Sequence, residues 1–253
     1  MRRAHAHFAA VLCACAAALG LPALAEASSG GGGLSGGGGS EAGASSGATT
    51  QPGNLTVTAS EGGMSIATRA SAFLSNSLRF SGSVPSRDAG RTIEIELYGQ
   101  KTNWSWTPTV QARVNGDGTF SAVWQTNHIG RFAARAVLAS GQSGASSASS
   151  SWPTVTLTVY RPSIATWYAD WGSSTACGVV LRKSTLGVAN RTLPCGTQVA
   201  LYYGGRTITV PVIDRGPYAN HADWDLTEAT AKLLSTKSAG VAHIGAVSLP
   251  RRQ

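Results

Sequence analysis

The hydrophobic pattern of residues 54–160 predicts a run of short β-strands. Apolar and polar residues alternate with a period of two in most of these segments, as expected for strands with one buried face. Asn115-Gly-Asp-Gly118 is a strong hairpin signal between two of them. The predicted strands cover residues 55–58, 78–82, 92–98, 109–114, 119–124, 132–138 and 154–159. This spacing predicts an immunoglobulin-like β-sandwich.

Three tryptophans of this region allow two interpretations. Trp104, Trp106 and Trp124 can form a surface on which sugar rings stack. Aromatic residues in a small sandwich are more often part of its core, and both alternatives are compatible with the pattern.

Residues 163–253 predict a second domain, again mostly β, with one short helix. Strands are expected at residues 164–168, 186–189, 198–203, 207–213 and 241–249. The helix should run from Glu228 to Leu234, because Asp225 or Thr227 can cap its N-terminus and Glu228 suits the positive end of the helix dipole. Arg161-Pro162 predicts a short, stiff junction between the two domains.

The first 25 residues have the pattern of an export signal. Arg2 and Arg3 precede an apolar run, and Ala23-Leu-Ala25 fits a cleavage site. The apolar run is too short, and too interrupted by other residues, to form a membrane-spanning helix. Leu12-Cys-Ala-Cys15 faintly resembles a lipidation box, and cleavage after Ala25 is the favoured alternative. We therefore expect a secreted, cell-wall-associated protein with no membrane span once the signal is removed.

Residues 26–53 are expected to form a flexible linker. From Ser28 to Pro52 the chain is almost wholly Gly, Ser, Ala and Thr. Such a segment buries too little apolar surface to offset the entropy lost on ordering it. The glycines are not a phosphate-binding loop, because the flanking strand and the Lys-Ser/Thr pair of that motif are missing.

The charge distribution is consistent with the cell wall as the surroundings. Removing residues 1–25, which hold two arginines and no acid, lowers the formal net charge from +8 to +6. The surplus lies in residues 161–253, where ten Lys and Arg face five Asp and Glu. A basic excess favours a polyanionic environment. We do not expect a nucleic-acid partner, because export argues against one and the chain has no basic run interleaved with aromatic residues.

Only Cys177 and Cys195 remain after removal of the signal. An even number of cysteines in an exported chain predicts one disulfide, worth about 3 kcal/mol by loop-closure entropy. These cysteines and the scattered histidines lack the spacing of metal ligands. Neither a metal ion nor another cofactor is expected.

Two carboxylates eleven residues apart, Asp214 and Asp225, are the candidate catalytic groups. A pair of nearby carboxylates can raise the pKa of one member, which then serves as an acid near neutral pH. Structural roles are the alternatives. Asp214 can stabilise a turn through its side chain and form an ion pair with Arg215, and Asp225 can cap the helix.

Five linked motifs of the C-terminal domain resemble, in order and spacing, the rare lipoprotein A (RlpA) family. They are Ala165-Thr-Trp-Tyr168, Thr175-Ala-Cys-Gly178, Asn190-Arg-Thr-Leu-Pro-Cys-Gly-Thr197, Asp214-Arg-Gly-Pro-Tyr218 and Asp225-Leu-Thr227. The resemblance implies a six-stranded double-psi β-barrel, related to expansin and barwin-like barrels, over residues 163–253. It also implies peptidoglycan, or another cell-wall polysaccharide, as the partner. Some members of the family are lytic transglycosylases.

The resemblance also implies roles for individual residues. Asp214 matches the family's functional aspartate, and Asp225 matches the aspartate that expansin-like barrels place in the polysaccharide groove. Active relatives carry a glutamate and a histidine where this chain has Val179 and Asn190.

The candidate substrate-binding residues flank the aspartates: Tyr168, Asn190, Arg215, Tyr218 and Trp224. The aromatic rings can stack on sugars, and the amide and guanidinium can form hydrogen bonds. We therefore expect an exported protein whose barrel engages peptidoglycan glycan strands, either as a lytic transglycosylase with Asp214 as the acid or as an expansin-like module that binds without cutting. A secreted protein-interaction domain is the third alternative.

Overall fold

The computed structural model describes residues 51–52, 55–139, 152–219 and 221–250. The export signal predicted over residues 1–25 lies outside the described residues. So does the linker predicted over residues 26–53, except for Gln51–Pro52. These two residues form β1, which pairs antiparallel with β13 (Arg206–Asp214), so this end of the predicted linker is a strand. Within the described ranges, no helix is long and apolar enough to cross a membrane.

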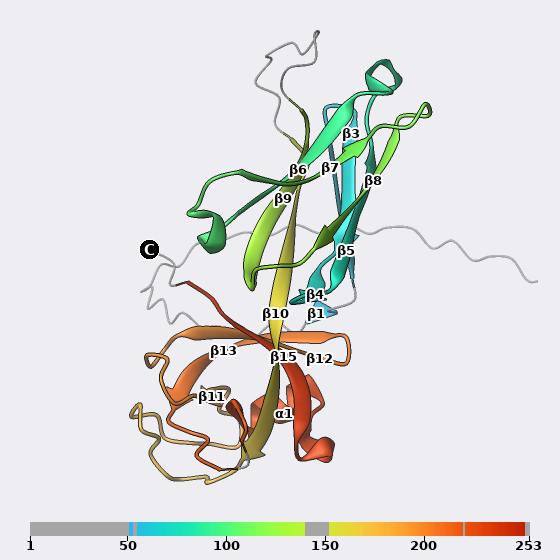
Figure 1. The fold of residues 1–253 in the computed structure, drawn as a ribbon. Coiled ribbons are helices and arrows are strands. Elements are labelled where there is room, and N and C mark those ends of the chain that lie inside the picture. The colour runs from blue at the N-terminus through green and yellow to red at the C-terminus, as the bar shows by residue number, and fades with distance from the viewer. Residues whose placement is uncertain (1–50, 53–54, 140–151, 220, 251–253) are drawn as a thin grey trace, which may run out of the picture. The chain divides into compact units, whose positions relative to one another are not determined.

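The N-terminal domain is a sandwich of two β-sheets around one core (Figure 1). One sheet has the strand order β2-β3-β5-β8, and the other has the order β7-β6-β9-β10, with β4 paired to β10. The strands are β2 (Thr56–Glu61), β3 (Met64–Arg69), β4 (Ser71–Phe73), β5 (Ser77–Ser83), β6 (Thr92–Gly99), β7 (Thr107–Arg113), β8 (Thr119–Gln125), β9 (Gly130–Leu138) and β10 (Thr154–Tyr168). Its immunoglobulin-like topology stays a prediction.

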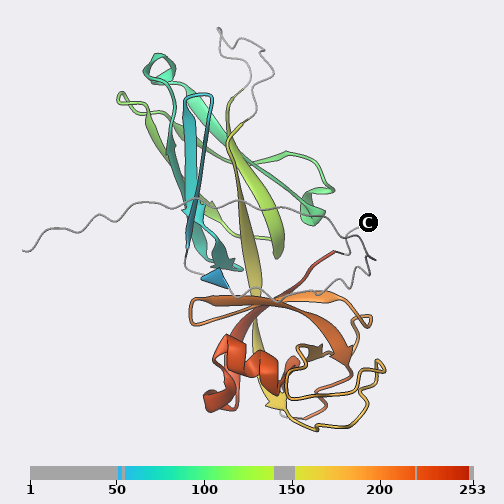
Figure 2. The ribbon, with the colours of Figure 1, turned by 180° about the vertical axis from the view of Figure 1, so that it is seen from behind.

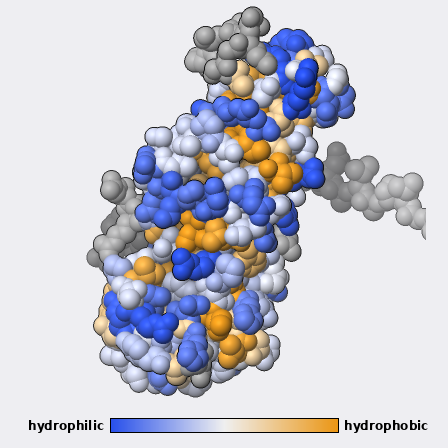
Figure 3. Space-filling model, viewed as in Figure 1, coloured by the Kyte–Doolittle hydropathy of each residue, from blue (hydrophilic) through white to orange (hydrophobic). Residues whose placement is uncertain are grey.

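The core of the sandwich takes side chains from both sheets. Ile66 and Phe80 of the first sheet and Ile95, Phe132 and Leu157 of the second are at most 1% exposed. The surface is mixed, and Figure 3 shows hydrophobic residues in separate patches among hydrophilic ones on the face in view. Trp124 is 4% exposed, which places it among the core residues.

The C-terminal domain is a closed barrel of six strands. Its order is β14-β11-β13-β12-β15-β10, and parallel pairing of β14 with β10 closes it. Besides β10 and β13, its strands are β11 (Val188–Ala189), β12 (Gln198–Tyr203), β14 (Trp224–Thr227) and β15 (Ala242–Ser248). The core contains Val199, Leu201, Ile208, Val210 and Leu226, all fully buried. The predicted all-β fold with a six-stranded barrel and one short helix is confirmed.

The helix α1 (Glu228–Leu234) has the predicted bounds. Thr227 is its N-cap, and the Thr227 side chain accepts a hydrogen bond from the backbone N–H of Thr230. Asp225 lies two residues earlier, inside β14. The alternative in which Asp225 caps the helix is therefore wrong.

Strand β10 runs without a break through the junction predicted at Arg161-Pro162 (Figures 1 and 2). Its first half pairs with β9, its middle with β15 and its last residues with β14. Phe73 and Tyr160 both pack against Tyr202 of β12, each with ring centroids 5.5 Å apart. A sandwich residue and a barrel residue thus meet beside the strand that both domains share.

Gly245 of β15 tests this packing. A Cβ atom there would lie 2.8 Å from Cβ of Tyr160 and 3.0 Å from Cε1 of Phe73. Because Tyr160 is buried and cannot move aside, Gly245→Ala should lower the free energy of unfolding by about 1–3 kcal/mol. Urea denaturation measures the change. Gly116→Ala is the matched control, since nothing lies within 4 Å of its added Cβ, and equal stability of the two variants would contradict the prediction.

Candidate functional site

Four side chains form a row across four neighbouring barrel strands. Thr166 of β10 is in register with Asp225 of β14. Ala189 of β11 is in register with Asp225 on one side and with Asp214 of β13 on the other. The two aspartates are therefore two strand spacings apart, about 10 Å between their Cα atoms. The small Ala189 side chain between them leaves room for a ligand.

All four residues of this row line one open cavity of about 270 Å³, which we call the acid cavity. Its other lining residues are Tyr168, Asp170, Arg215, Gly216, Pro217, Tyr218 and Ala219. The volume lies slightly below the range of about 300–1,000 Å³ typical of sites that enclose a small molecule. It suits a short part of a longer polymer. A larger cavity of about 450 Å³ lies on the outer face of the β2-β3-β5-β8 sheet, but no carboxylate lines it.

Backbone donors hold the Asp214 carboxylate at the end of β13. Its Oδ1 accepts hydrogen bonds from the backbone N–H groups of Ala176 at 2.9 Å and Arg215 at 2.8 Å. Ala176 precedes Cys177, whose predicted disulfide with Cys195 is confirmed. The disulfide thus fixes the loop that supplies one of the two donors.

Asp225 has a different environment. Its carboxylate is half-buried and accepts a hydrogen bond of 2.8 Å from the Thr166 hydroxyl. Burial raises the pKa of Asp225, and the negative charges of Asp214 and Asp170 raise it further, against the opposing effect of the Thr166 hydrogen bond. A carboxyl that keeps its proton to higher pH is suited to general acid catalysis.

Two tyrosines complete the acid cavity. Burial, followed by the charges of Asp214 and Asp225, raises the pKa of Tyr168, so its hydroxyl remains a proton donor in hydrogen bonds. That hydroxyl is buried and forms a hydrogen bond with the Asp214 carboxylate, so it helps to hold this aspartate. Tyr218 is 79% exposed at the rim, where its ring can pack against a sugar.

The structure places three of the predicted substrate-binding residues in structural roles. Trp224 is 8% exposed in the barrel core and does not line the acid cavity, so its assignment to the groove is wrong. Asn190 is also absent from the lining, and its Oδ1 accepts hydrogen bonds from the backbone N–H groups of Thr192 and Leu193. Arg215 lines the cavity, but its guanidinium donates to the carbonyls of Asn190 and Leu193 and so ties this loop to β13.

The sequence patterns did not indicate Thr166, Asp170 or Ala189 as site residues. Thr166 and Asp170 flank Tyr168 at even spacing, which is the one signal that could have found them. Ala189 carries no chemical group, and only its register with both aspartates reveals its place. Among the described residues, no group of three or more His, Cys, Asp and Glu side chains is arranged to hold a metal ion.

Comparisons with known proteins identify relatives of the C-terminal domain. Residues 162–246 match the family described as lytic transglycolase. The probable endolytic peptidoglycan transglycosylase RlpA of Treponema pallidum (strain Nichols) is 38% identical over 84 residues, 32% of this chain and 26% of that protein. The C-terminal domain is an RlpA-like double-psi β-barrel. The resemblance predicted from the motifs is thereby confirmed for this domain.

The RlpA-like barrel has further relatives. The probable endolytic peptidoglycan transglycosylase RlpA of Aquifex aeolicus (strain VF5) is 37% identical over 86 residues, 32% of this chain and 38% of that protein. This chain therefore spans 26% and 38% of the lengths of these two relatives. Among solved structures, the Streptomyces papain inhibitor is 31% identical, with 35% of this chain and 93% of the inhibitor covered and a TM-score of 0.31.

The raised pKa of Asp225 predicts a pH-dependent stability. The folded protein binds this proton more tightly than the unfolded chain does, so the wild type loses stability as pH rises from the ordinary pKa of 3.8 through the raised value. Asp225→Asn lacks this loss. The free energy of unfolding of the wild type should therefore decrease relative to that of Asp225→Asn between about pH 4 and pH 7. Urea denaturation at several pH values measures both.

Asp117→Asn supplies a control of opposite sign. Hydrogen bonds from the backbone and side chain of Thr119 lower the pKa of Asp117, so its contribution is present above the ordinary pKa and is lost as pH falls. A stability difference for Asp225→Asn that does not change with pH would contradict the assignment.

Proposed function

We propose that the RlpA-like barrel binds a glycan strand of peptidoglycan in the acid cavity and cleaves it as a lytic transglycosylase. The observation that carries this proposal is an aspartate of raised pKa, Asp225, in an open cavity shared with a second carboxylate, Asp214. The relatives are named peptidoglycan transglycosylases, which supports the substrate class. The export signal expected in residues 1–25 would bring the protein to the cell wall.

In this proposal Asp225 is the acid, in place of Asp214, which the sequence favoured for that role. Burial and the Asp214 charge both favour the protonated form of Asp225. Asp214 is held by two backbone N–H groups, so its position is fixed relative to the bond that breaks. Its negative charge stabilises the positive charge that develops on the sugar ring in the transition state.

The reaction needs one proton transfer in each direction. Asp225 gives its proton to the glycosidic oxygen while the bond from that oxygen to C1 of N-acetylmuramic acid breaks. The 6-hydroxyl of the same sugar bonds to C1, closes a 1,6-anhydro ring and returns a proton to Asp225. No water is consumed, and the acid is regenerated. The exposed Tyr218 ring positions the strand.

A second candidate function is binding or loosening of the glycan without cleavage, as in expansin-like barrels. One observation favours it. The resemblance to the RlpA family implies that active relatives carry a glutamate and a histidine at the positions of Val179 and Asn190, and neither residue present here can titrate. The Asn190 side chain serves its own loop, and Val179 does not line the acid cavity.

Product analysis separates the two functions. Incubating the protein with purified sacculi should release muropeptides that end in 1,6-anhydro-N-acetylmuramic acid, detected by mass spectrometry. Asp225→Asn should reduce this release at least about a hundredfold, because a general acid contributes about 10²–10⁴ in rate. Asp117→Asn, in the sandwich, should leave the release unchanged.

The dependence on pH adds a second readout. Because Asp225 must be protonated, the rate should fall as pH rises through its raised pKa. If no anhydro product forms at any acidic or neutral pH, while the protein still sediments with sacculi and Ala189→Leu lowers that sedimentation, cleavage is excluded and the binding function of the barrel stands. Failure to sediment would exclude both and leave the protein-interaction alternative.

Ala189→Leu tests the acid cavity directly. Ala189 is 3% exposed between the two aspartates, so a leucine side chain there would fill the space that the ligand needs. Sedimentation of the protein with sacculi should fall, and thermal unfolding of the variant checks that the barrel is still folded. Ala67→Leu, on the outer face of the sandwich, is the matched control. Undiminished cleavage by Ala189→Leu would contradict this placement of the substrate.

A further inference from the structure

Three aromatic residues gather on the surface of the sandwich, away from its core. Tyr98 stands near the end of β6, and Trp104 and Trp106 follow η2 (Gln100–Thr102) in the segment that leads to β7. The ring centroid of Tyr98 lies 5.8 Å from that of Trp104 and 5.3 Å from that of Trp106. None of the three belongs to a hydrophobic core cluster of the described residues. Trp104 is 52% exposed.

The backbone holds Trp104 in an unfavourable conformation. Asn103 and Trp104 have φ values of 51° and 56°, in the left-handed region that bulky side chains rarely adopt. The segment is nevertheless well defined, because the N–H of Trp104 donates to the carbonyl of Gly99 at 2.9 Å. Strain of this kind concentrates at functional sites. Here it displays a large ring that the fold does not bury.

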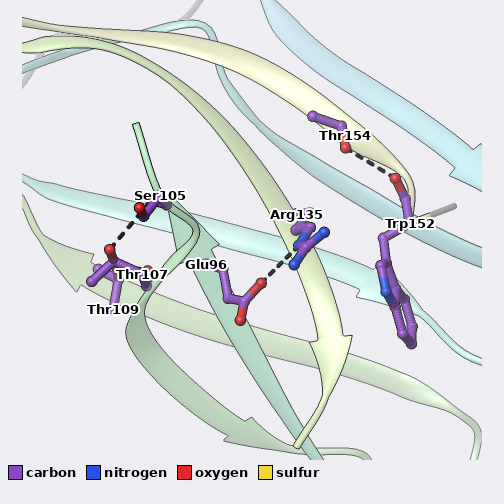
Figure 4. A network of polar contacts seen from close by, with 7 residues as sticks. All are labelled: Glu96, Ser105, Thr107, Thr109, Arg135, Trp152 and Thr154. Atoms are coloured by element: carbon purple, nitrogen blue, oxygen red, sulfur yellow. Dashed lines mark hydrogen bonds and ion pairs between the residues drawn. The ribbon is translucent and has the colours of Figure 1, made fainter. Parts of the chain in front are cut away.

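Polar groups with fixed positions lie beside these rings. The Arg135 guanidinium stacks over Trp106 at 4.2 Å from the ring centroid and pairs with the Glu96 carboxylate at 2.7 Å. Figure 4 shows Glu96 and Arg135 reaching toward each other, with Thr109 on the neighbouring strand. Glu94, further along β6 on the same face, accepts a hydrogen bond from Gln111 at 2.8 Å. The charges of Glu96 and Arg135 cancel, and Glu94, whose partner Gln111 is neutral, adds one negative charge.

We propose that this surface, which we call the aromatic face and which comprises Glu96, Tyr98, Trp104, Trp106 and Arg135, binds a polysaccharide. A pyranose ring has an apolar face of C–H groups that packs on an exposed aromatic ring, and its hydroxyls bond to charged groups at the edge. Because Glu96 and Arg135 neutralise each other, the ligand is a neutral sugar chain. A polyanion would need unpaired cations.

The aromatic face does not depend on the acid chemistry of the barrel. It would hold the chain on the same polymer that the RlpA-like barrel engages. A second binding site on one chain raises retention through the high local concentration of the linked partner.

The test measures binding of an N-acetylglucosamine hexamer to the full-length protein by titration calorimetry. Trp104→Ala should weaken this binding about tenfold, as expected when one aromatic contact is lost. Trp104→Phe keeps an apolar ring and should retain most of the affinity. Val123→Ala removes a side chain that is 46% exposed on the other sheet and should change nothing. Thermal unfolding of each variant checks that the fold is intact.

The same titrations in the Ala189→Leu background separate the two sites. Equal weakening by Trp104→Ala with and without Ala189→Leu would show that the aromatic face binds independently of the acid cavity. If Trp104→Ala has no effect in either background, the inference is overturned, and the proposed function is still judged by Ala189→Leu alone. Absence of hexamer binding to the wild type would also overturn the inference, whereas cleavage of sacculi could persist.

Discussion

The backbone of β10 is the constraint on which the described structure depends. Its fifteen residues supply hydrogen-bond partners to β9 and β4 in the sandwich and to β15 and β14 in the barrel. Backbone groups removed from water must be paired, and this one strand meets that requirement for both domains. Its side chains divide in the same way, with Leu157 in the sandwich core and Ala165 in the barrel core. A break in β10 would open a sheet of the sandwich and the wall of the barrel together.

The same strand sets up the chemistry of the acid cavity. Parallel pairing of β10 with β14 brings the Thr166 hydroxyl within hydrogen-bond distance of Asp225. Strand β11 lies between β14 and β13, so Asp214 is two strand spacings from Asp225. The carboxylates of Asp214 and Asp225 therefore lie in different surroundings, although the two side chains are chemically identical. Asp225 is half-buried with a single hydroxyl donor, whereas Asp214 has two backbone donors. In the proposed function, environment, and not residue type, divides the roles of acid and charge stabiliser between them.

Sequence patterns predict most of the fold, because a half-buried strand repeats every second residue. Gln198–Tyr203 and Glu228–Leu234 have the predicted bounds. Strand β14 is not among the predicted strands, because its four residues are too few for a clear alternation and run directly into the helix. The error at Trp224 has a related cause. Neighbours on a strand point to opposite faces, so a cavity-facing Asp225 requires a core-facing Trp224. The meeting of the two aspartates depends on register with the two-residue strand β11, which sequence spacing does not encode.

The acid cavity is a gap in a wall of side chains, created where β11 carries only a methyl group at Ala189. The side chain at this position therefore limits the width of the cavity between the two aspartates, in a segment whose backbone is paired on both sides. Homologous barrels that differ at this position can diverge in the ligands they admit while the surrounding scaffold is inherited intact. A change of side chain at this one position alters the space for a ligand without removing a backbone hydrogen bond of the barrel.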